Sequence, residues 1–569
     1  MWRSPLLAGL PAPPDDREKT LYCDRNLALI VRASLASFGA LLISQAKFVT
    51  AQPDLLVLSP LLAFTVAYYL ISLCVNFGTR GFDYARHRAF AGAWRPDRYP
   101  SLDIFLPVCG EPTTVLHNTW AHVHELIQAY PGRAIAYVLD DGASGDVQVM
   151  AAGYAFGYLS RPDRGWMKKA GNLRYGFAHS RGEFILVLDA DFAPRADLPL
   201  EMLPYLAADG RLGIVQSPQY FRVTRRQSWI ERGAGAVQEL FYRMVQVSRD
   251  RHDGAICVGS CAIYRREALR SNGGTTLIEH SEDVHTGFDL KQAGWGLRYI
   301  PVPLSAGLCP ADPDSFLSQQ YRWCCGSMSL LTSRKFWSAR LRWRTRFCYL
   351  SGLCYYIHTA AFIFAAPLIP LLMLTVMPER VRLINYVFVV PSIIYNFAVF
   401  PAWHRCRFGP TALMVKLLYG WAHLFALWDN LRGRRIGWQA SGGAGRKAGI
   451  SRIWTGIWLW NGTTSAAWVL LAAARAVQYG PQNFLVLLLG GIAASLTTAM
   501  ALGAHRNFRM TVQKGNAADE TDKDRGERGG RGGARHRGSD RRNALRTAGA
   551  RGEQRRPASP RARARHAAY

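Results

Sequence analysis

The stretch "EFILVLDADF" (183–192) decides the fold of the central part of this chain. Its apolar run predicts a short buried strand, and Asp189 and Asp191 stand where that strand ends. Side chains two residues apart in an extended chain point the same way, so these carboxylates repel each other unless a cation lies between them. A hard cation such as Mg²⁺ often binds one or two carboxylates together with substrate phosphates. The alternative is a pair of solvated acids, and an Asp-x-Asp pair alone does not decide between the two.

Strand-like and helix-like patterns alternate around this stretch, over residues 100–315. The segments "SLDIFLPV" (101–108) and "AIAYVLDDG" (134–142) are typical of strands, and "TTVLHNTWAHVHELIQAY" (113–130) and "KKAGNLRYGFAHS" (168–180) of helices. Such alternation predicts an α/β domain. Open α/β sheets bind ligands beyond the carboxyl ends of their strands, where a second acid pair, Asp140 and Asp141, also lies.

The composition predicts membrane segments on both sides of this domain. The chain is 49% hydrophobic and only 19% charged, yet its formal net charge is +29. This combination indicates apolar spans beside basic cytoplasmic parts. Six apolar runs are long enough to span a bilayer: 27–46, 55–75, 348–376, 384–403, 453–474 and 484–504.

The distribution of Lys and Arg predicts the topology. These residues gather in the segment 405–452 and are scarce near 47–53 and 476–481. Because they collect in cytoplasmic loops, both termini and the central domain are expected in the cytoplasm, beneath the inner or plasma membrane. The expected parts are a cytoplasmic segment (1–26), two spans (27–76), the α/β domain (77–346), four spans (347–504) and a disordered basic Arg/Gly-rich tail (505–569).

Two basic features at the cytoplasmic side have competing interpretations. The tail could bind RNA, but contact with anionic lipid is favoured beside a membrane, so no nucleic-acid partner is expected. The segment 411–431 is apolar apart from Lys416, His423 and Asp429. It predicts an amphipathic helix that lies at the cytoplasmic interface.

Two further motifs fall inside or next to the α/β domain. In "MKKAGNLRYG", Lys169 stands at a helix start, where backbone amides and an ammonium favour anions, although a charged cap would have the same pattern. In "HSEDVHTGFDLKQAGWG" (280–296), Ser281 predicts an N-cap and Gly294 a helix end. Asp283, held rigidly at that helix start, could act as a general base.

A third motif, "FLSQQYRWCCGS" (316–327), precedes the third apolar run. Gln319, Arg322 and Trp323 are spaced i, i+3 and i+4, so a helix places them on one face. An interfacial helix with a snorkelling Arg would have this pattern. An Arg fork that pairs with phosphate oxygens would have it too.

The order of the motifs favours function in each case. "VLDDG", "KAGNL", "LDAD", "SED" and "QQYRW" follow one another over residues 138–323. This series resembles the processive glycosyltransferase family 2 enzymes, in particular cellulose synthases and their bacterial relatives. The resemblance implies a GT-A type α/β glycosyltransferase domain inserted between transmembrane helices, and an inverting reaction that uses a UDP-sugar donor and a growing polysaccharide acceptor.

The resemblance also assigns roles to individual residues. On the donor side it implies uridine contacts from Asp140 and Asp141, nucleotide contacts from Glu111 and Lys169, and Mg²⁺ or Mn²⁺ bound by Asp189 and Asp191. Asp283 would deprotonate the acceptor hydroxyl. On the acceptor side it implies Gln319 and Trp323, with Arg322 at the diphosphate, and Glu282 and Ser260 nearby.

The sequence departs from the family pattern at positions that bear on the sugar. Cys109 stands where bacterial cellulose synthases have a Tyr, and Val258 where they have a Cys. "GWQASGG" (437–443) stands in place of the gating loop, with Trp438 and Ser441 matching its aromatic and its Thr. These changes leave the sugar and the linkage open.

Three functions therefore compete. The favoured one is a processive synthase that extends a cellulose-like β-glucan from UDP-glucose and exports it, with membrane lipid and accessory export or polymer-modifying proteins as further partners. A second is a synthase of another sugar or linkage, such as a chitin or hyaluronan type that uses UDP-GlcNAc, or a β-1,3 or mixed-linkage glucan synthase. A third is a transporter or lipid-linked scaffold with structural acids, which leaves the ordered acidic motifs unexplained.

Overall fold

The computed structural model describes residues 9–434 and 449–531, with side chains up to residue 508. Residues Met1–Phe508 form one compact unit and Arg509–Tyr569 a second. Helix α21 (Pro481–Arg531) continues beyond the expected end of the last span. The expectation of a disordered tail from residue 505 is therefore wrong up to Arg531, and the rest of that tail lies outside the described residues.

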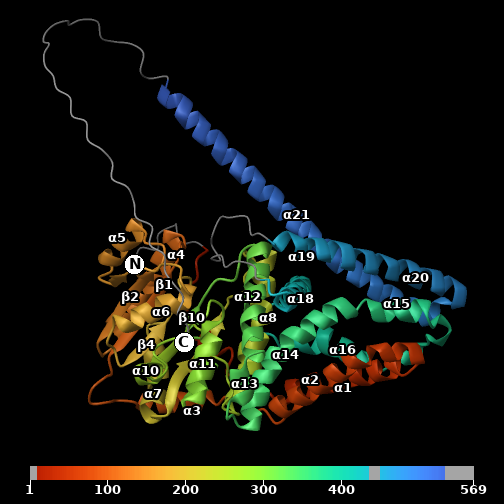
Figure 1. The fold of residues 1–569 in the computed structure, drawn as a ribbon, viewed down its shortest axis with the longest axis horizontal. Coiled ribbons are helices and arrows are strands. Elements are labelled where there is room, and N and C mark those ends of the chain that lie inside the picture. Colours follow the sequence, from red (N-terminus) through yellow and green to blue (C-terminus); the bar gives the residue numbers. More distant parts are fainter. Residues whose placement is uncertain (1–8, 435–448, 532–569) are drawn as a thin grey trace, which may run out of the picture. The chain divides into compact units, whose positions relative to one another are not determined.

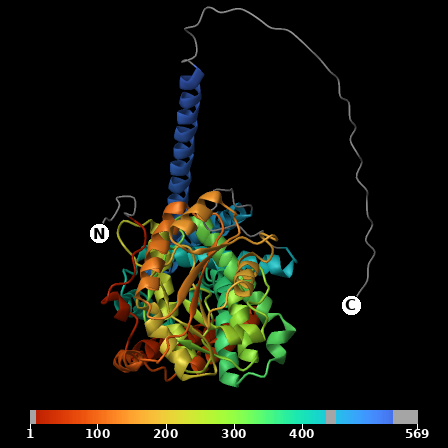
Figure 2. The same ribbon diagram turned by 90° about the vertical axis from the view of Figure 1, so that its left-hand side faces the viewer.

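A mixed seven-stranded sheet forms the centre of the α/β domain (Figures 1 and 2). Its strands, in spatial order, are β3 (Gly157–Leu159), β2 (Ala134–Asp140), β1 (Leu102–Val108), β4 (Phe184–Val187), β8 (Ala262–Arg265), β6 (Leu212–Gln216) and β9 (Gly296–Tyr299). β1, β2, β3 and β4 run parallel, whereas β8 is antiparallel to both of its neighbours, β4 and β6. The α/β domain predicted from alternating patterns is confirmed.

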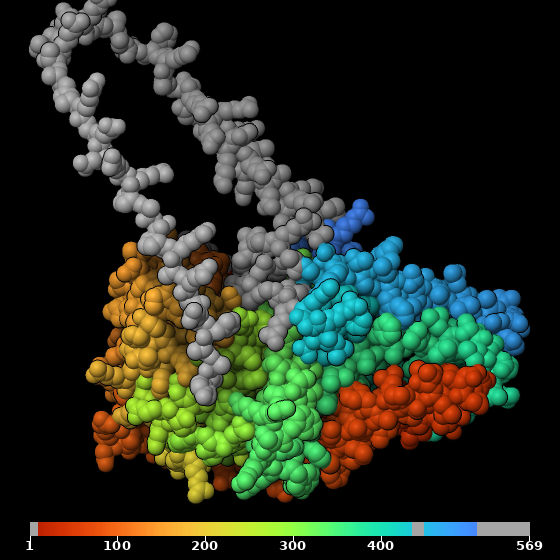
Figure 3. Space-filling view, viewed as in Figure 1, coloured from red at the N-terminus to blue at the C-terminus, as the bar shows by residue number. Residues whose placement is uncertain are grey.

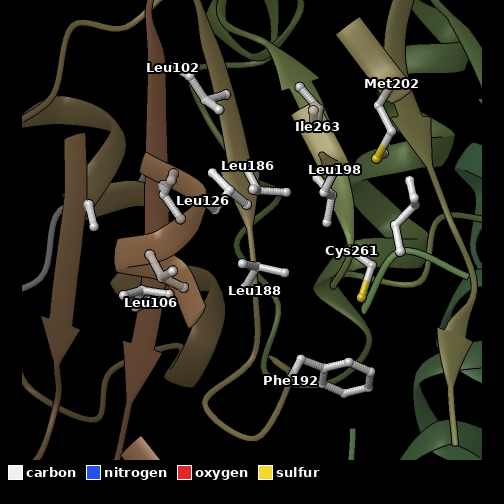
Figure 4. Close-up of a cluster of buried hydrophobic side chains, with 14 of the residues drawn as sticks. Leu102, Leu106, Leu126, Leu186, Leu188, Phe192, Leu198, Met202, Cys261 and Ile263 are labelled. Atoms are coloured by element: carbon white, nitrogen blue, oxygen red, sulfur yellow. The ribbon is translucent and has the colours of Figure 1, made fainter. Parts of the chain in front are cut away.

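Helices cover both faces of this sheet because alternate side chains of each strand point to opposite faces. One face packs against α4 (Thr113–Ala129), α5 (Gly145–Gly153) and α7 (Leu198–Ala208). The other packs against α6 (Lys168–Ala178), α10 (Arg266–Ser271) and α11 (Glu282–Gln292). In β1, Leu102 and Leu106 join the first core, shown in Figure 4, and Phe105 joins the second.

A small three-stranded sheet and the N-terminal segment complete the domain. The small sheet consists of β5 (Ala193–Pro194), β10 (Ser305–Ala306) and β7 (Gln219–Tyr220). Glu18 accepts a hydrogen bond from Arg222 at 2.6 Å, and Lys19 donates one to Asp197 at 2.7 Å. The segment before the first apolar helix is thus packed onto the α/β domain rather than separate from it.

Five helices among the described residues are long and apolar enough to cross a membrane, judged by length and composition. They are Ala28–Val49 (α1), Pro53–Asn76 (including α2, Ser59–Asn76), Trp343–Thr375 (α14, Trp343–Ala365, and α15, Leu368–Thr375), Pro410–Leu431 (α18) and Pro481–Phe508 in α21. Four of them match predicted spans. The break between α14 and α15 falls at Pro367, as a proline inside an apolar helix predicts.

The predicted spans 384–403 and 453–474 look different in the structure. The first contains only a short apolar helix, Val390–Trp403, divided into α16 (Val390–Ile394), a π-helical turn and α17 (Phe400–Trp403). Pro391 lies in the first turn of α16, where its missing amide hydrogen is tolerated; farther inside a helix it would break the hydrogen bonding, which limits extension towards 384. The second is divided by a π-helical segment, Ile457–Gly462, into α19 (Ile450–Gly456) and α20 (Thr463–Tyr479).

Helix α18 was expected at the interface, with its polar residues facing water. Instead, 56% of the most apolar stretch of this helix is buried inside the protein. The corresponding share is 11–22% in the other four membrane-length helices. It packs against α8 (Trp229–Leu240), α12 (Pro313–Leu331) and α14, and Figure 1 shows it nearly end-on between the α/β domain and the other apolar helices. His423 and Asp429 are buried, so the predicted water-facing polar side is wrong.

The domain contains a buried ion pair whose loss we expect to destabilise the fold. The Asp103 carboxylate accepts hydrogen bonds from Arg266 at 2.7 Å and from the Gly182 amide at 2.6 Å, and both charged groups are buried. Asp103→Ala would leave the guanidinium buried without its carboxylate, at a cost of about 3–5 kcal/mol. We expect a clearly lower midpoint of thermal unfolding for the purified full chain.

The matched control is Arg98→Ala, which removes an exposed ion pair with Glu183. Exposed pairs contribute about 0–1 kcal/mol. Equal midpoints for the Asp103 and Arg98 variants would contradict the structural importance of the buried pair.

Candidate active site

The two acid pairs stand at one edge of the large sheet. β2 ends at Asp140, and Asp189 and Asp191 follow the end of β4. Both strands pair in parallel with β1, so their carboxyl ends lie at the same edge. This is the edge at which open α/β sheets bind ligands.

One ammonium group joins several motifs at this edge. The Nζ of Lys169, in the first turn of α6, contacts the Asp189 carboxylate, lies 3.8 Å from Glu282 Oε1 and donates to the Gly259 carbonyl at 3.2 Å. Burial would lower the pKa of Lys169, but Asp189 and Glu282 outweigh it and raise the pKa. Lys169 therefore stays charged and brings the "KAGNL", "LDAD" and "SED" motifs together.

Asp283 is held against a loop that has no room for a side chain. Its Oδ1 accepts the Val284 amide at 2.8 Å. Gly259 has a φ of +72°, and a Cβ there would lie 2.8 Å from the Asp283 Cβ and 2.9 Å from its Oδ2. Burial, followed by the neighbouring Glu282, raises the pKa of Asp283 to about 7. The group can thus bind and release a proton near neutral pH, as a general base must.

Burial raises the pKa values of two further acids at this edge, Asp191 and Glu111. Burial and then the charge of Asp189 raise the pKa of Asp191 to about 7. Burial also raises the pKa of Glu111, whose carboxylate accepts the Cys109 amide at 2.6 Å. The Asp189 carboxylate is paired with the Lys169 ammonium.

Asp189 and Asp191 fit a divalent cation that is also bound by substrate. Among the described residues, no group of three or more His, Cys, Asp or Glu side chains could hold a metal ion alone. Two oxygen donors are the protein share that Mg²⁺ commonly takes when phosphates supply the rest. A cation between them would remove the repulsion that raises the pKa of Asp191.

Asp140 and Asp141 are already engaged with protein groups. Asp140 accepts the amides of Gly142 at 2.7 Å and Ser144 at 2.9 Å, and the Tyr158 hydroxyl at 2.9 Å. Asp141 forms a two-pronged pair with Arg161, at 2.6 and 2.7 Å. These carboxylates shape the loop after β2, and sequence patterns gave no sign of Arg161 because it lies 20 residues from its partner.

Helix α12 carries the Gln319, Arg322 and Trp323 side chains, all partly buried. Arg322 donates to the Ser318 hydroxyl at 3.0 Å, and burial lowers its pKa to about 10. The side chain remains charged at neutral pH, and a desolvated guanidinium binds an anion more strongly than one in water.

α12 packs directly against the start of α11, which carries Asp283. A Cβ at Gly326 would lie 2.5 Å from the Ser281 Cβ and closer still to its Oγ. His285 contacts the Ser329 hydroxyl at 3.0 Å. The His285 and Gly326 contacts were not expected from the sequence, where nothing distinguishes them from ordinary helix residues.

Backbone strain is concentrated at the same motifs. Met167, just before α6, and Lys168, its first residue, have φ values of 50° and 47°, and Ser281, before α11, has 56°. Such left-handed conformations cost about 1–3 kcal/mol each and persist where the surroundings enforce them. Ser281 occupies the N-cap position but makes no capping hydrogen bond with its side chain, so the predicted cap is wrong. Gly294 ends α11 with a φ of +91°, as predicted.

The far side of α12 is fixed to the apolar helices. Tyr321 donates to the Asp429 carboxylate at 2.8 Å, and Arg452 donates to the same carboxylate at 2.9 Å. Asp429 lies in α18 and Arg452 in α19. The predicted gating residues Trp438 and Ser441 belong to the segment between α18 and α19 and lie outside the described residues.

A family comparison matches this part of the chain. Residues 184–400 match the family described as "Glycosyl transferase family group 2". The matched range begins at β4 and includes α11 and α12.

Curated relatives match about half of the chain. The UDP-forming cellulose synthase 1 catalytic subunit of Komagataeibacter xylinus is 31% identical over 277 residues, which are 48% of this chain and 36% of that protein. A UDP-forming cellulose synthase catalytic subunit of Pseudomonas fluorescens SBW25 is 27% identical over 267 residues, 46% of this chain and 36% of that protein. This chain thus spans little more than a third of these relatives. The matches confirm the family resemblance, and the mixed sheet with apolar helices before and after it confirms the expected α/β domain between apolar helices.

Solved structures with similar folds are more distant in sequence. The mannosyltransferase PcManGT from Pyrobaculum calidifontis, in complex with GDP-Man and Mn²⁺, has a TM-score of 0.44 and 16% identity, and the match covers 66% of this chain and 98% of that one. Glucosyl-3-phosphoglycerate synthase from Mycobacterium tuberculosis, with Mn²⁺, UDP and phosphoglyceric acid, has a TM-score of 0.30 and 16% identity, over 45% of this chain and 84% of that one.

Because α11 and α12 are in close contact at Gly326, we expect a single added methyl group there to lower the thermal stability clearly. Gly326→Ala would force the helices apart at Ser281, and such overpacking typically costs about 1–3 kcal/mol. We expect a lower midpoint of thermal unfolding, largely recovered in the double variant Gly326→Ala with Ser281→Gly, because glycine also suits the left-handed backbone there.

Gly92→Ala is the matched control, since this glycine lies in α3 (Tyr84–Ala93) and its added Cβ would meet no atom within 4 Å. An unchanged midpoint for Gly326→Ala, or no recovery in the double variant, would contradict the close contact.

Proposed function

We propose that this chain, whose central segment is related to family 2 glycosyltransferases and to bacterial cellulose synthase catalytic subunits, is a membrane-embedded processive inverting glycosyltransferase. It polymerises a cellulose-like β-glucan from UDP-glucose and translocates the product across the membrane. The observation that carries the proposal is the cluster of Lys169, Asp189, Glu282 and Asp283, which lies at the ligand-binding edge of the sheet and joins helix α12 through α11.

The donor would bind where the charges of this cluster are complementary to a diphosphate. Asp189 and Asp191 would hold Mg²⁺ or Mn²⁺, which supplies positive charge to the departing UDP. Lys169 and Arg322 place two further positive charges for the phosphate oxygens. The loop shaped by Asp140 would border the uridine.

Asp283 would remove the proton from the attacking hydroxyl of the acceptor. An inverting transfer needs one base, on the side of the sugar opposite the leaving group. The rigid setting of Asp283 at the start of α11 and its raised pKa support this role. Glu282 and Ser260, which accepts the Asp189 amide at 3.0 Å, lie close enough to contact the acceptor or the donor.

The acceptor would leave the site beside α12, with its terminal sugar on Trp323 and hydrogen-bonded to Gln319. α12 is bonded to the apolar helices through Asp429, which supports coupling of synthesis to export. We further propose cytoplasmic termini, a gating role for Trp438 and Ser441, and accessory proteins that receive or modify the polymer. Glu111 would complete the nucleotide side.

Incubation of the purified full chain with Mg²⁺ or Mn²⁺ and single UDP-sugars tests this function. We expect a high-mass product from UDP-glucose, not from UDP-GlcNAc, and its digestion by cellulase. Asp283→Asn should lower the rate by about 100- to 10,000-fold, the usual contribution of a general base. Asp146→Asn, which changes an exposed acid in α5, is the matched control.

Three other outcomes would contradict parts of this proposal. A product that resists cellulase but is cut by a β-1,3-glucanase, or one made from UDP-GlcNAc, would overturn the cellulose-like product. Full activity of Asp283→Asn would overturn the base assignment.

The raised pKa of Asp283 predicts a pH dependence. A general base acts in its ionised form, so kcat/KM should be about half-maximal near pH 7, reach a plateau about one pH unit higher, and fall as the pH drops below about 7. Because the charge of Glu282 raises this pKa, Glu282→Gln should move the acidic limb to lower pH. A pH–rate profile of both proteins checks this, and an acidic limb that stays in place would contradict the electrostatic coupling.

A further inference from the structure

The ends of two apolar helices meet beside the α/β domain. α2 ends at Asn76, and the Arg251 guanidinium donates to the carbonyl of Gly78, just beyond that end. α14 begins at Trp343, and the Thr345 hydroxyl donates to the His252 carbonyl at 2.9 Å. Residues from three distant parts of the sequence therefore form one continuous surface. Figure 3 shows the green surface of the α13–α14 region next to the red surface of the first two helices.

This surface is basic and aromatic. Phe77, Trp337 and Trp343 are 65%, 54% and 55% exposed. The exposed cations around them are Arg251, Arg340, Arg342 and Arg344. We call these seven residues the collar. The Arg344 guanidinium lies 5.0 Å from the centre of the Trp343 ring, so cation and indole face solvent together.

Acids close to the collar are paired elsewhere. Asp253 contacts Lys291, and Asp289 contacts Lys335. Asp250 lies 3.5 Å from Arg298 and accepts the Tyr299 amide at 2.7 Å. Within the described residues, no ion pair reaches Arg340, Arg342 or Arg344. The collar thus carries a local excess of positive charge.

We propose that the collar binds the head groups of anionic phospholipids and makes the protein selective for an anionic membrane surface. The inference rests on the placement of α2 and α14 in the membrane, which is part of the proposed function, but not on the sugar chemistry. The phosphates would pair with the arginines, while the aromatic rings lie at head-group depth.

The order of residues favours lipid over an acidic protein or a nucleic acid. Arg340, Arg342 and Arg344 alternate with Leu341 and Trp343 at the start of a helix of membrane-spanning length. Exposed indoles and arginines at this position are typical of the cytoplasmic membrane interface.

Competition between two lipids tests the proposal. The purified full chain is equilibrated in detergent with equal amounts of phosphatidylcholine and phosphatidylglycerol of the same acyl chains, and the retained lipids are counted by native mass spectrometry. A basic residue near an anionic surface is worth about 1 kcal/mol, or roughly fivefold. We expect phosphatidylglycerol to be enriched at least about fivefold over its bulk ratio.

The variant Arg340→Gln/Arg342→Gln/Arg344→Gln should bring the ratio close to that of the bulk mixture. The matched control, Arg133→Gln/Arg211→Gln/Arg270→Gln, changes three exposed arginines of the α/β domain and should keep the enrichment. Raising the salt from about 0.1 to about 1 M shortens the Debye length from about 10 to about 3 Å and should weaken the enrichment. Thermal unfolding in phosphatidylcholine verifies that both variants are folded.

Equal retention of the two lipids by the unchanged protein, or full enrichment in the collar variant, would overturn the proposal. Binding of anionic lipid without any polymer synthesis would support the role of the collar and contradict the proposed function. Polymer synthesis without lipid selectivity would support the proposed function and contradict the role of the collar.

Discussion

The candidate site depends on one partly buried ammonium group among carboxylates. Lys169 contacts Asp189 and lies 3.8 Å from Glu282. Burial, and then the charges of these two acids, raise the pKa values of Asp191 and Asp283. Without that charge, the carboxylates from β4 and α11 would repel one another across the edge of the sheet. The lysine thus stabilises the approach of two segments that are about a hundred residues apart, and it does so at the place where the proposed donor carries its own charges.

Steric contacts extend this arrangement to the apolar helices. Gly259 leaves room for Asp283, and Gly326 leaves room for Ser281, so α11 is enclosed between a loop and α12. On its other side, α12 is joined through Tyr321 to Asp429, which Arg452 also binds. A displacement of any of these helices would therefore be transmitted to Asp283. This gives a physical reason for a domain inserted between apolar helices rather than tethered beside them.

Sequence patterns predicted two features of this structure: the alternating strands and helices, and the acids that follow the strand ends. The alternation of strands and helices predicted the α/β domain, and the acids at strand ends lie at one edge of its sheet, as expected. Patterns could not reveal that Asp140 and Asp141 are bound by their own loop and by Arg161, because those partners depend on tertiary packing. The polar side of α18 misled for a related reason: His423 and Asp429 look like a water-facing stripe, yet tertiary contacts bury both.

The raised pKa values imply that binding of the proposed metal-bound donor would depend on pH. Asp191 and Asp283 both have pKa values of about 7, so near neutral pH each carries a proton for part of the time. Oxygen ligands bind a divalent cation in their ionised form, and binding therefore releases protons. A cation held by Asp189 and Asp191 would therefore compete with a proton at Asp191, and its affinity would fall as the pH drops below about 7.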